Sequence, residues 1–103
     1  MTVALGGDFG KPRPALVVQS DFVPATYRTV TIVPLTSHLE MAPLFRITVE
    51  PSRGNGLRKI SQVMIDKSMT QLREKLGPPI GHLDEDTLVR VNRALVLWLG
   101  LVA

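Results

Sequence analysis

The sequence contains no cysteine, and this absence removes a whole set of possible chemistries. Disulfide bonds, thiolate metal sites and cysteine nucleophiles are all excluded by it. Aromatic residues are scarce, at 5% of the chain, and no apolar run approaches the ~20 residues that a membrane-spanning helix requires. The chain also opens without a basic segment followed by a long apolar stretch, so no secretory signal is indicated and we expect a cytoplasmic protein.

The motifs of several enzyme classes are missing as well. The only histidines, His38 and His82, have no acidic residue at ligand spacing, so we expect no metal site and no cofactor. No Gly-x-Ser-x-Gly motif is present, which argues against a serine hydrolase. The glycine-rich segment before Lys11 has three residues between its glycines instead of four, and Pro12 follows where a phosphate loop needs Ser or Thr. Nucleotide binding by that route is therefore excluded.

Size and charge narrow the remaining possibilities. A chain of 103 residues is long enough for one domain with a single modest core, which we assign to residues 1–103. Its hydrophobic content of 45% and mean hydropathy of +0.18 indicate a well-packed globule. The net charge of +3 and the isoelectric point near 9.8 favour an anionic partner, either a nucleic acid or an acidic protein.

One segment places a cation at the start of a hydrophobic strand. Pro12 and Pro14 each fix their own φ angle and push the preceding residue toward extended geometry, so Lys11 and Arg13 are held in a stiff segment. The apolar run over residues 15–18 that follows is typical of a buried strand. A guanidinium group held in this way is well placed to meet an anion, although an exposed arginine beside a strand would give the same pattern.

Short segments of strand character alternate with Gly and Pro turns along most of the chain. We predict strands at residues 2–5, 15–18, 29–35, 45–49, 57–66 and 80–83, and a helix of about two turns at residues 70–76. Pro34 indicates an edge strand or a bulge, and the Asn55-Gly56 step predicts a hairpin turn. This pattern is typical of a mainly β fold with helices (α+β), built as a small, strongly curved antiparallel sheet or barrel.

The C-terminal segment is the clearest predicted helix. Asp84 is a good N-cap residue, and the acidic residues that follow complement the positive end of the helix dipole. Four apolar residues recur on the face that we expect to cover the sheet, namely Leu88, Val91, Leu95 and Trp98. Val89, Val96 and Leu97 lie partly off that face, and this extra apolar surface favours a homodimer.

Four polar residues could carry chemistry: Arg13, Thr36, Ser37 and Asp66. An arginine matches the geometry of a phosphate, a hydroxyl can donate to a phosphoryl oxygen, and a carboxylate could accept a proton from an attacking hydroxyl. Without a metal or a protein nucleophile, the simplest reaction is one in which the substrate supplies its own nucleophile, as RNA does with its 2′-OH. Structural alternatives remain: Thr36 ends a strand, Ser37 closes a turn, and Asp66 pairs with Lys67 or Arg58.

The run from Gly10 to Asp21 (GKPRPALVVQSD) resembles the Arg-Pro-x-Leu-Val-x-Gln-(Asn/Ser)-Asp signature of the MazF/PemK toxin family. Further similarities lie at Val33–Ser37, Ser61–Asp66, Ile80–Gly81 and Leu99–Leu101, so the resemblance covers nearly the whole chain. It implies an SH3-like barrel with a C-terminal helix and a homodimer. It also implies a metal-independent endoribonuclease that cleaves single-stranded messenger RNA at a short sequence and is neutralised by a cognate antitoxin.

The resemblance also assigns roles to residues. The catalytic arginine of the family falls on Arg13, the catalytic threonine on Thr36, and the acid found in some members on Asp66, a candidate general base. We further expect substrate contacts at Lys11, Ser37 and Phe9. The first loop lacks the histidine that some members place there, and the run from Met69 to Leu72 replaces an Arg-Thr-Ile-Asp run of many members, so base recognition does not transfer.

Two other functions are compatible with this fold. The CcdB toxins share the barrel, poison DNA gyrase without cutting nucleic acid, and end in a functional Trp-Gly-Ile that Trp98-Leu99-Gly100-Leu101 resembles loosely. A barrel that has lost activity could also bind RNA or protein only. The presence of Arg13 and Thr36 favours the nuclease.

Overall fold

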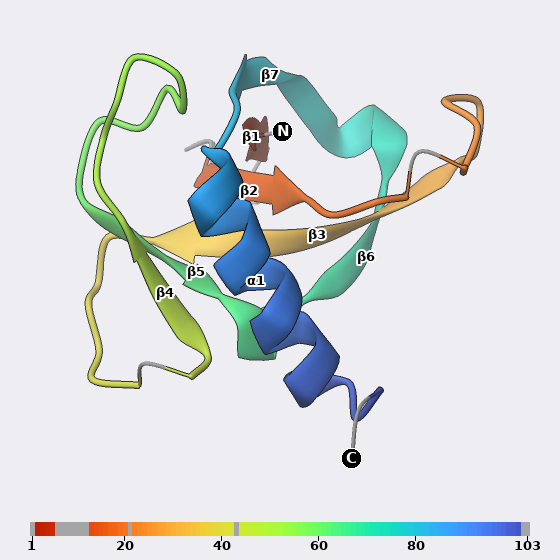
Figure 1. Cartoon of the computed structure of the whole chain (residues 1–103). Coiled ribbons are helices and arrows are strands. Elements are labelled where there is room, and N and C mark those ends of the chain that lie inside the picture. Colours follow the sequence, from red (N-terminus) through yellow and green to blue (C-terminus); the bar gives the residue numbers. More distant parts are fainter. Residues whose placement is uncertain (1, 6–12, 21, 43, 102–103) are drawn as a thin grey trace.

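The computed structural model describes residues 2–5, 13–20, 22–42 and 44–101 (Figure 1). Within them lie seven strands, two 3₁₀ helices and one α-helix. In chain order these are β1 (Thr2–Leu5), β2 (Arg13–Val17), β3 (Thr29–Thr36), β4 (Arg46–Val49), β5 (Ser61–Met64), η1 (Ile65–Lys67), β6 (Met69–Leu72), η2 (Arg73–Lys75), β7 (Leu76–Gly81) and α1 (Glu85–Trp98). No helix of the described residues is long and apolar enough to cross a membrane.

The strands form an antiparallel sheet in the order β4-β5-β3-β2-β1-β7, and β6 also pairs with β3. Strand β3 is therefore shared: β2 pairs along one of its edges, while β6 and β5 follow one another along the other. In Figure 1, β3 crosses the middle of the molecule and the sheet curves around it. The predicted α+β class is confirmed, but the sheet is open, because the described strands at its two ends, β4 and β7, do not pair with each other.

The loop between β4 and β5 reaches across to the end of β7. The backbone N–H of His82 donates to the carbonyl oxygen of Gly54 over 2.7 Å. Gly56 has a φ of +69°, and a Cβ atom there would lie 2.0 Å from the carbonyl oxygen of Ile80. Only glycine fits such a close approach in this conformation. A loop contact, and not a strand pair, thus joins these two parts of the molecule.

Pro34 lies within the central strand, so the first of its two predicted alternatives, an edge strand, is wrong. β6 pairs with residues 29–32 of β3 and β5 with residues 35–36, so Pro34 lies where β3 changes partner. Proline has no N–H to donate to a neighbouring strand. Pro34 is tolerated because neither β5 nor β6 has a residue paired with it, on the edge of β3 that these two strands share.

Strand β3 buries apolar side chains on both of its faces. On one face, Val33 and Leu35 join a large cluster that α1 covers, together with Leu16, Val63 and Val91. On the other face, a smaller cluster forms, with Ala15, Val30 and Ile32 at its centre and Val17 and Leu76 packed against it. Each fully buried Val, Leu or Ile side chain stabilises the fold by about 1.5–3 kcal/mol through its removal from water.

The C-terminal helix begins as predicted. The Asp84 carboxylate accepts the Thr87 backbone N–H at 3.1 Å and the Thr87 hydroxyl at 2.6 Å, which satisfies the first turn of α1. Val91 is fully buried, and Leu88 and Leu95 pack against the core. Trp98 differs from the prediction, since it is 45% exposed and lies edge-to-face against Phe45 with ring centroids 5.1 Å apart.

The helix predicted at residues 70–76 is wrong. The segment forms β6, the single turn η2 and the start of β7. β6 pairs with β3 from Thr29↔Leu72 to Ile32↔Met69, so hydrogen bonding to a strand distant in sequence overrides the local helical pattern. The strand predicted at residues 57–66 begins only at Ser61, and the one predicted at 80–83 lies within and beyond the end of β7.

Candidate active site

Strands β2 and β3 bring Arg13 and Thr36 to the same end of the sheet. Their paired residues run from Val17↔Ile32 to Ala15↔Pro34. Arg13 and Thr36 each lie two residues beyond the last of these pairs, and both line the same groove. The Val18 N–H donates to the Thr31 carbonyl oxygen over 3.1 Å, so Val18 and Thr31 form a hydrogen-bonded pair. Hydrogen-bonded and non-hydrogen-bonded pairs alternate along an antiparallel ladder. Continued at this register, the strands would set Arg13 and Thr36 at a position of the non-hydrogen-bonded type, in which side chains lie closest.

These two residues line a groove of about 550 Å³, which we call the Arg13 groove. Its walls come from β2, the end of β3, the β4–β5 loop, the start of β5 and β7. Three cationic side chains and three hydroxyls line it, namely Arg13, Arg58, Lys59, Thr36, Ser37 and Ser61. No carboxylate is among the described lining residues. A concave surface of this composition attracts a polyanion.

A buried asparagine fixes the loop that carries two of these cations. Asn55 is 4% exposed, and its Oδ1 atom accepts the backbone N–H groups of Ser52 and Leu57, both over 3.0 Å. Its Nδ2 donates to the Glu50 carbonyl over 2.8 Å. Because Leu57 is itself buried in the core, the chain leaves this loop in a fixed direction. Arg58 and Lys59 follow at once and reach the groove.

The Thr36 hydroxyl is oriented by the backbone. Its Oγ1 atom accepts the N–H of His38 over 3.1 Å. With that acceptor position used, the hydroxyl hydrogen remains available to donate to a ligand oxygen. Ser37 is exposed and also lines the groove. The end of β3 therefore presents two hydroxyls beside the Arg13 side chain.

Asp66 is not among the residues that line the groove. Its two carboxylate oxygens accept hydrogen bonds from Arg46, from Nε over 3.0 Å and from Nη2 over 3.2 Å. Burial by itself raises the pKa of Asp66, but the hydrogen bonds and charge of Arg46 outweigh it and hold that pKa below its ordinary value. The carboxylate thus pairs with Arg46, and not with Lys67 or Arg58.

The other predicted site residues are placed as follows. Arg13, Thr36 and Ser37 meet in the groove, whereas Lys11 and Phe9 lie outside the described residues. The His38 side chain is 81% exposed and lies 3.9 Å from Glu40. Within the described part of the chain, no group of three His, Asp or Glu side chains could hold a metal ion.

Sequence reasoning placed a turn at Asn55 but missed the buried hydrogen bonds of its side chain, and it missed Arg58 and Lys59 as groove residues. The available signal was the Asn55-Gly56 step followed within three residues by two adjacent cations and then a strand. That spacing does not show which strand the loop approaches. The position of the loop is set by its contact with β7, and that contact depends on the backbone geometry at Gly56.

Comparison with known proteins places this architecture among toxins. Residues 1–99 match the family described as PemK-like, MazF-like toxin of type II toxin-antitoxin system. A probable endoribonuclease MazF of Mycolicibacterium smegmatis is 45% identical over 98 residues, which cover 95% of this chain and 89% of that protein. The Mycobacterium tuberculosis toxin MazF-mt6 has a similar structure, with a TM-score of 0.82 at 23% identity and full coverage of both chains. A MazE-MazF structure from Deinococcus radiodurans gives a TM-score of 0.76 at 26% identity, covering 96% of this chain and 90% of that one.

Proposed function

The chain belongs to the PemK-like, MazF-like family of toxins of type II toxin–antitoxin systems, and from this premise we propose that it is an endoribonuclease that cuts single-stranded messenger RNA in the Arg13 groove. One observation carries the assignment of the site. Arg13 and Thr36 lie on facing strands in a groove with two further cations and no carboxylate among its described lining residues. RNA is the polyanion that also brings its own nucleophile.

The proposed reaction is an attack by the RNA 2′-oxygen on the adjacent phosphorus. The bond from phosphorus to the 5′-oxygen breaks, which leaves a 2′,3′-cyclic phosphate and a 5′-hydroxyl. Negative charge grows on the non-bridging oxygens in the transition state, and Arg13 would stabilise it with its guanidinium group. The Thr36 hydroxyl would donate to the same phosphate. We assign Asp66 to the structural pair with Arg46 and not to proton abstraction, because a lowered pKa weakens a general base.

The proposal includes partners and a compartment. The toxin would act without a metal ion in the cytoplasm and would be neutralised by a cognate antitoxin protein. In support, a mycobacterial endoribonuclease of similar structure forms a complex with its cognate antitoxin. It would form a homodimer. Support for the dimer comes from apolar residues that are 45–71% exposed at and just beyond the end of α1, namely Leu97, Trp98, Leu99 and Leu101.

The test is cleavage of a single-stranded RNA in excess EDTA. We expect products that end in a 2′,3′-cyclic phosphate and a 5′-hydroxyl, while the DNA copy of the same strand stays intact. Replacing only the nucleotide on the 5′ side of the cut by its 2′-deoxy form should stop cleavage with little loss of binding, because phosphates and stacking supply most of the affinity.

Other outcomes would identify the rival functions. A gyrase poison would leave RNA intact and trap gyrase on DNA, and an inactive binding protein would shift RNA without cutting it. Cleavage of the deoxy-substituted strand at the same bond would reject the 2′-OH mechanism and the roles of Arg13 and Thr36 with it.

A further inference from the structure

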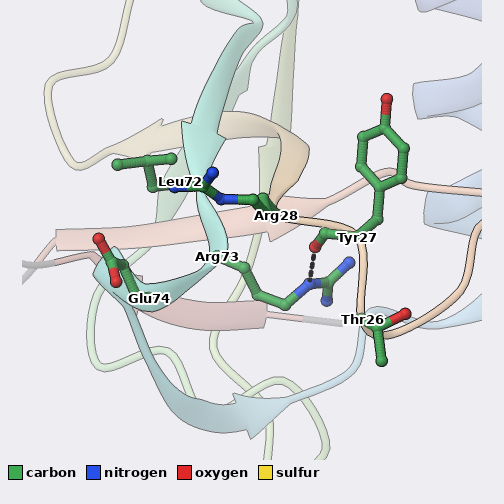
Figure 2. Close-up of a pocket in the computed structure, with 6 residues that line it drawn as sticks. All are labelled: Thr26, Tyr27, Arg28, Leu72, Arg73 and Glu74. Atoms are coloured by element: carbon green, nitrogen blue, oxygen red, sulfur yellow. Dashed lines mark hydrogen bonds between the residues drawn. The ribbon is translucent and has the colours of Figure 1, made fainter.

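A second cationic hollow lies at the opposite end of β3 from the Arg13 groove. Figure 2 shows one part of it, about 350 Å³, lined by Thr26, Tyr27, Arg28, Leu72, Arg73 and Glu74. A neighbouring part of about 460 Å³ shares Thr26, Tyr27 and Arg28 and adds Pro24 and Thr29. We call the two together the Tyr27 hollow. None of its residues lines the Arg13 groove.

Two hydrogen bonds hold Arg73 in place beside this hollow. Its Nε donates to the Tyr27 carbonyl oxygen over 2.9 Å, and its backbone N–H donates to the Arg28 carbonyl oxygen over 2.8 Å. The first bond occupies one edge of the guanidinium group and leaves the Nη donors for a ligand. In Figure 2 the guanidinium lies beside Thr26 and Tyr27, while the Glu74 carboxylate points away from it. A fixed arginine loses less entropy on binding an anion than a free one.

The other two key side chains are exposed. The Tyr27 side chain is 56% exposed although the chain has few aromatic residues, and Arg28 beside it is exposed as well. Proteins that bind single-stranded nucleic acids combine an aromatic ring, on which a base stacks, with cations that meet the backbone phosphates. One tyrosine and two arginines line the same hollow, beside a single carboxylate at Glu74. This composition matches a nucleotide unit better than it matches an apolar protein surface.

We propose that the Tyr27 hollow binds the single-stranded RNA substrate at a second point, away from the bond that is cut. This rests on the proposed function at the Arg13 groove. The eight residues of β3 separate the two sites by about 25 Å. A strand that reaches both sites must therefore extend several nucleotides beyond the cut, so the hollow contributes affinity only for long substrates.

The experiment compares two uncleavable RNAs by fluorescence anisotropy. Both carry 2′-fluoro substitutions, and they are unstructured strands of about 20 and about 5 nucleotides, chosen because single-stranded sites span about 4–16 nucleotides. The measured quantity is the ratio of the two affinities. In Tyr27→Ala the advantage of the long strand should fall about 5- to 150-fold, the range for loss of one stacked base. In Arg28→Gln the advantage of the long strand should fall as well. The slope of the logarithm of its binding constant against the logarithm of salt concentration should also become shallower, by about 0.7 for each phosphate that the variant no longer neutralises.

Matched controls isolate the hollow. Phe22→Ala removes an aromatic side chain that is 98% exposed in the same β2–β3 connection, and Arg93→Gln removes an exposed cation of α1. Both should keep the wild-type ratio. An unchanged ratio in Tyr27→Ala and Arg28→Gln overturns the proposal, even if those variants lose affinity for a protein partner. Cleavage by wild-type protein is measured separately, so a failure of the nuclease assignment is distinguishable from a failure of the second site.

Discussion

Arg13 and Arg46 are each the first residue of a strand in the same sheet, yet their surroundings differ in kind. The Arg46 side chain is only 11% exposed, forms two hydrogen bonds to Asp66 and lies 3.8 Å from a carboxylate oxygen of Glu40. Arg13 is exposed in a groove where the other charged lining residues are cations. An arginine whose carboxylate partners belong to the protein serves the fold, whereas one among cations is available to an anion from outside.

The largest effect that would separate the two arginines is on catalysis. In Arg13→Ala we expect the cleavage rate to fall by about 10²–10³-fold, because the variant lacks one preorganised donor to the transition-state charge. The far-UV circular dichroism and the melting temperature should stay close to those of the wild type, since Arg13 is exposed. Arg53→Ala, at another exposed arginine, is the control. A toxic, active Arg13→Ala protein would remove the distinction altogether.

A substitution at the partner of Arg46 should lower the stability of the fold and not the cleavage rate. Asp66→Asn breaks the pair with the nearly buried Arg46, and we expect the free energy of unfolding to fall by about 1–2 kcal/mol. The cleavage rate per folded molecule should be unaffected. Urea unfolding and initial rates measure the two quantities separately. Unchanged stability together with a rate loss as large as that of Arg13→Ala would instead make Asp66 the general base.

A smaller effect is expected at the two cations that the β4–β5 loop contributes. In Arg58→Ala and Lys59→Ala the KM for RNA should rise several-fold, and the salt dependence of binding should weaken by about 0.7 in slope for each phosphate left without its cation. The turnover number should change less than the KM, because these side chains are proposed to bind phosphates away from the reacting bond. Equal loss in both variants and in the Arg93→Ala control would point to net charge alone.

The smallest expected effect is on the stability of the fold at acidic pH. Hydrogen bonds from Thr87 lower the pKa of Asp84; burial raises that of Asp66, but Arg46 outweighs it and leaves this pKa lowered too. The unfolded chain therefore binds protons more readily than the folded one, and stability rises with pH in that window. The stabilisation is complete above the ordinary value of 3.8 and is lost as the pH falls through the lowered values. Urea midpoints in acid should shift less in Asp66→Asn and in Asp84→Asn than in the wild type; equal shifts would contradict this.

Sequence reasoning succeeded where the information is local. The N-cap at Asp84 and the buried run after Arg13 depend on neighbouring residues, and both are present in the structure. The segment at residues 70–76 failed because pairing with β3 is a long-range interaction that no local pattern reports. The position of Arg58 and Lys59 likewise depends on the contact between Gly56 and Ile80. The meeting of Arg13 with Thr36 was expected from a family resemblance, and the register of β2 and β3 supplies its physical basis.

The shared position of β3 has a consequence for how the molecule opens. Its backbone bonds to three other strands and it buries apolar side chains on both of its faces, so its amides can exchange with solvent only when several elements separate together. We expect the amides of Val30, Ile32 and Val33 to be among the slowest to exchange deuterium. Because Thr36 is the last residue of this strand, the proposed cleavage site is anchored on one side to the part of the structure that we expect to open last. The site should therefore survive partial unfolding that releases α1.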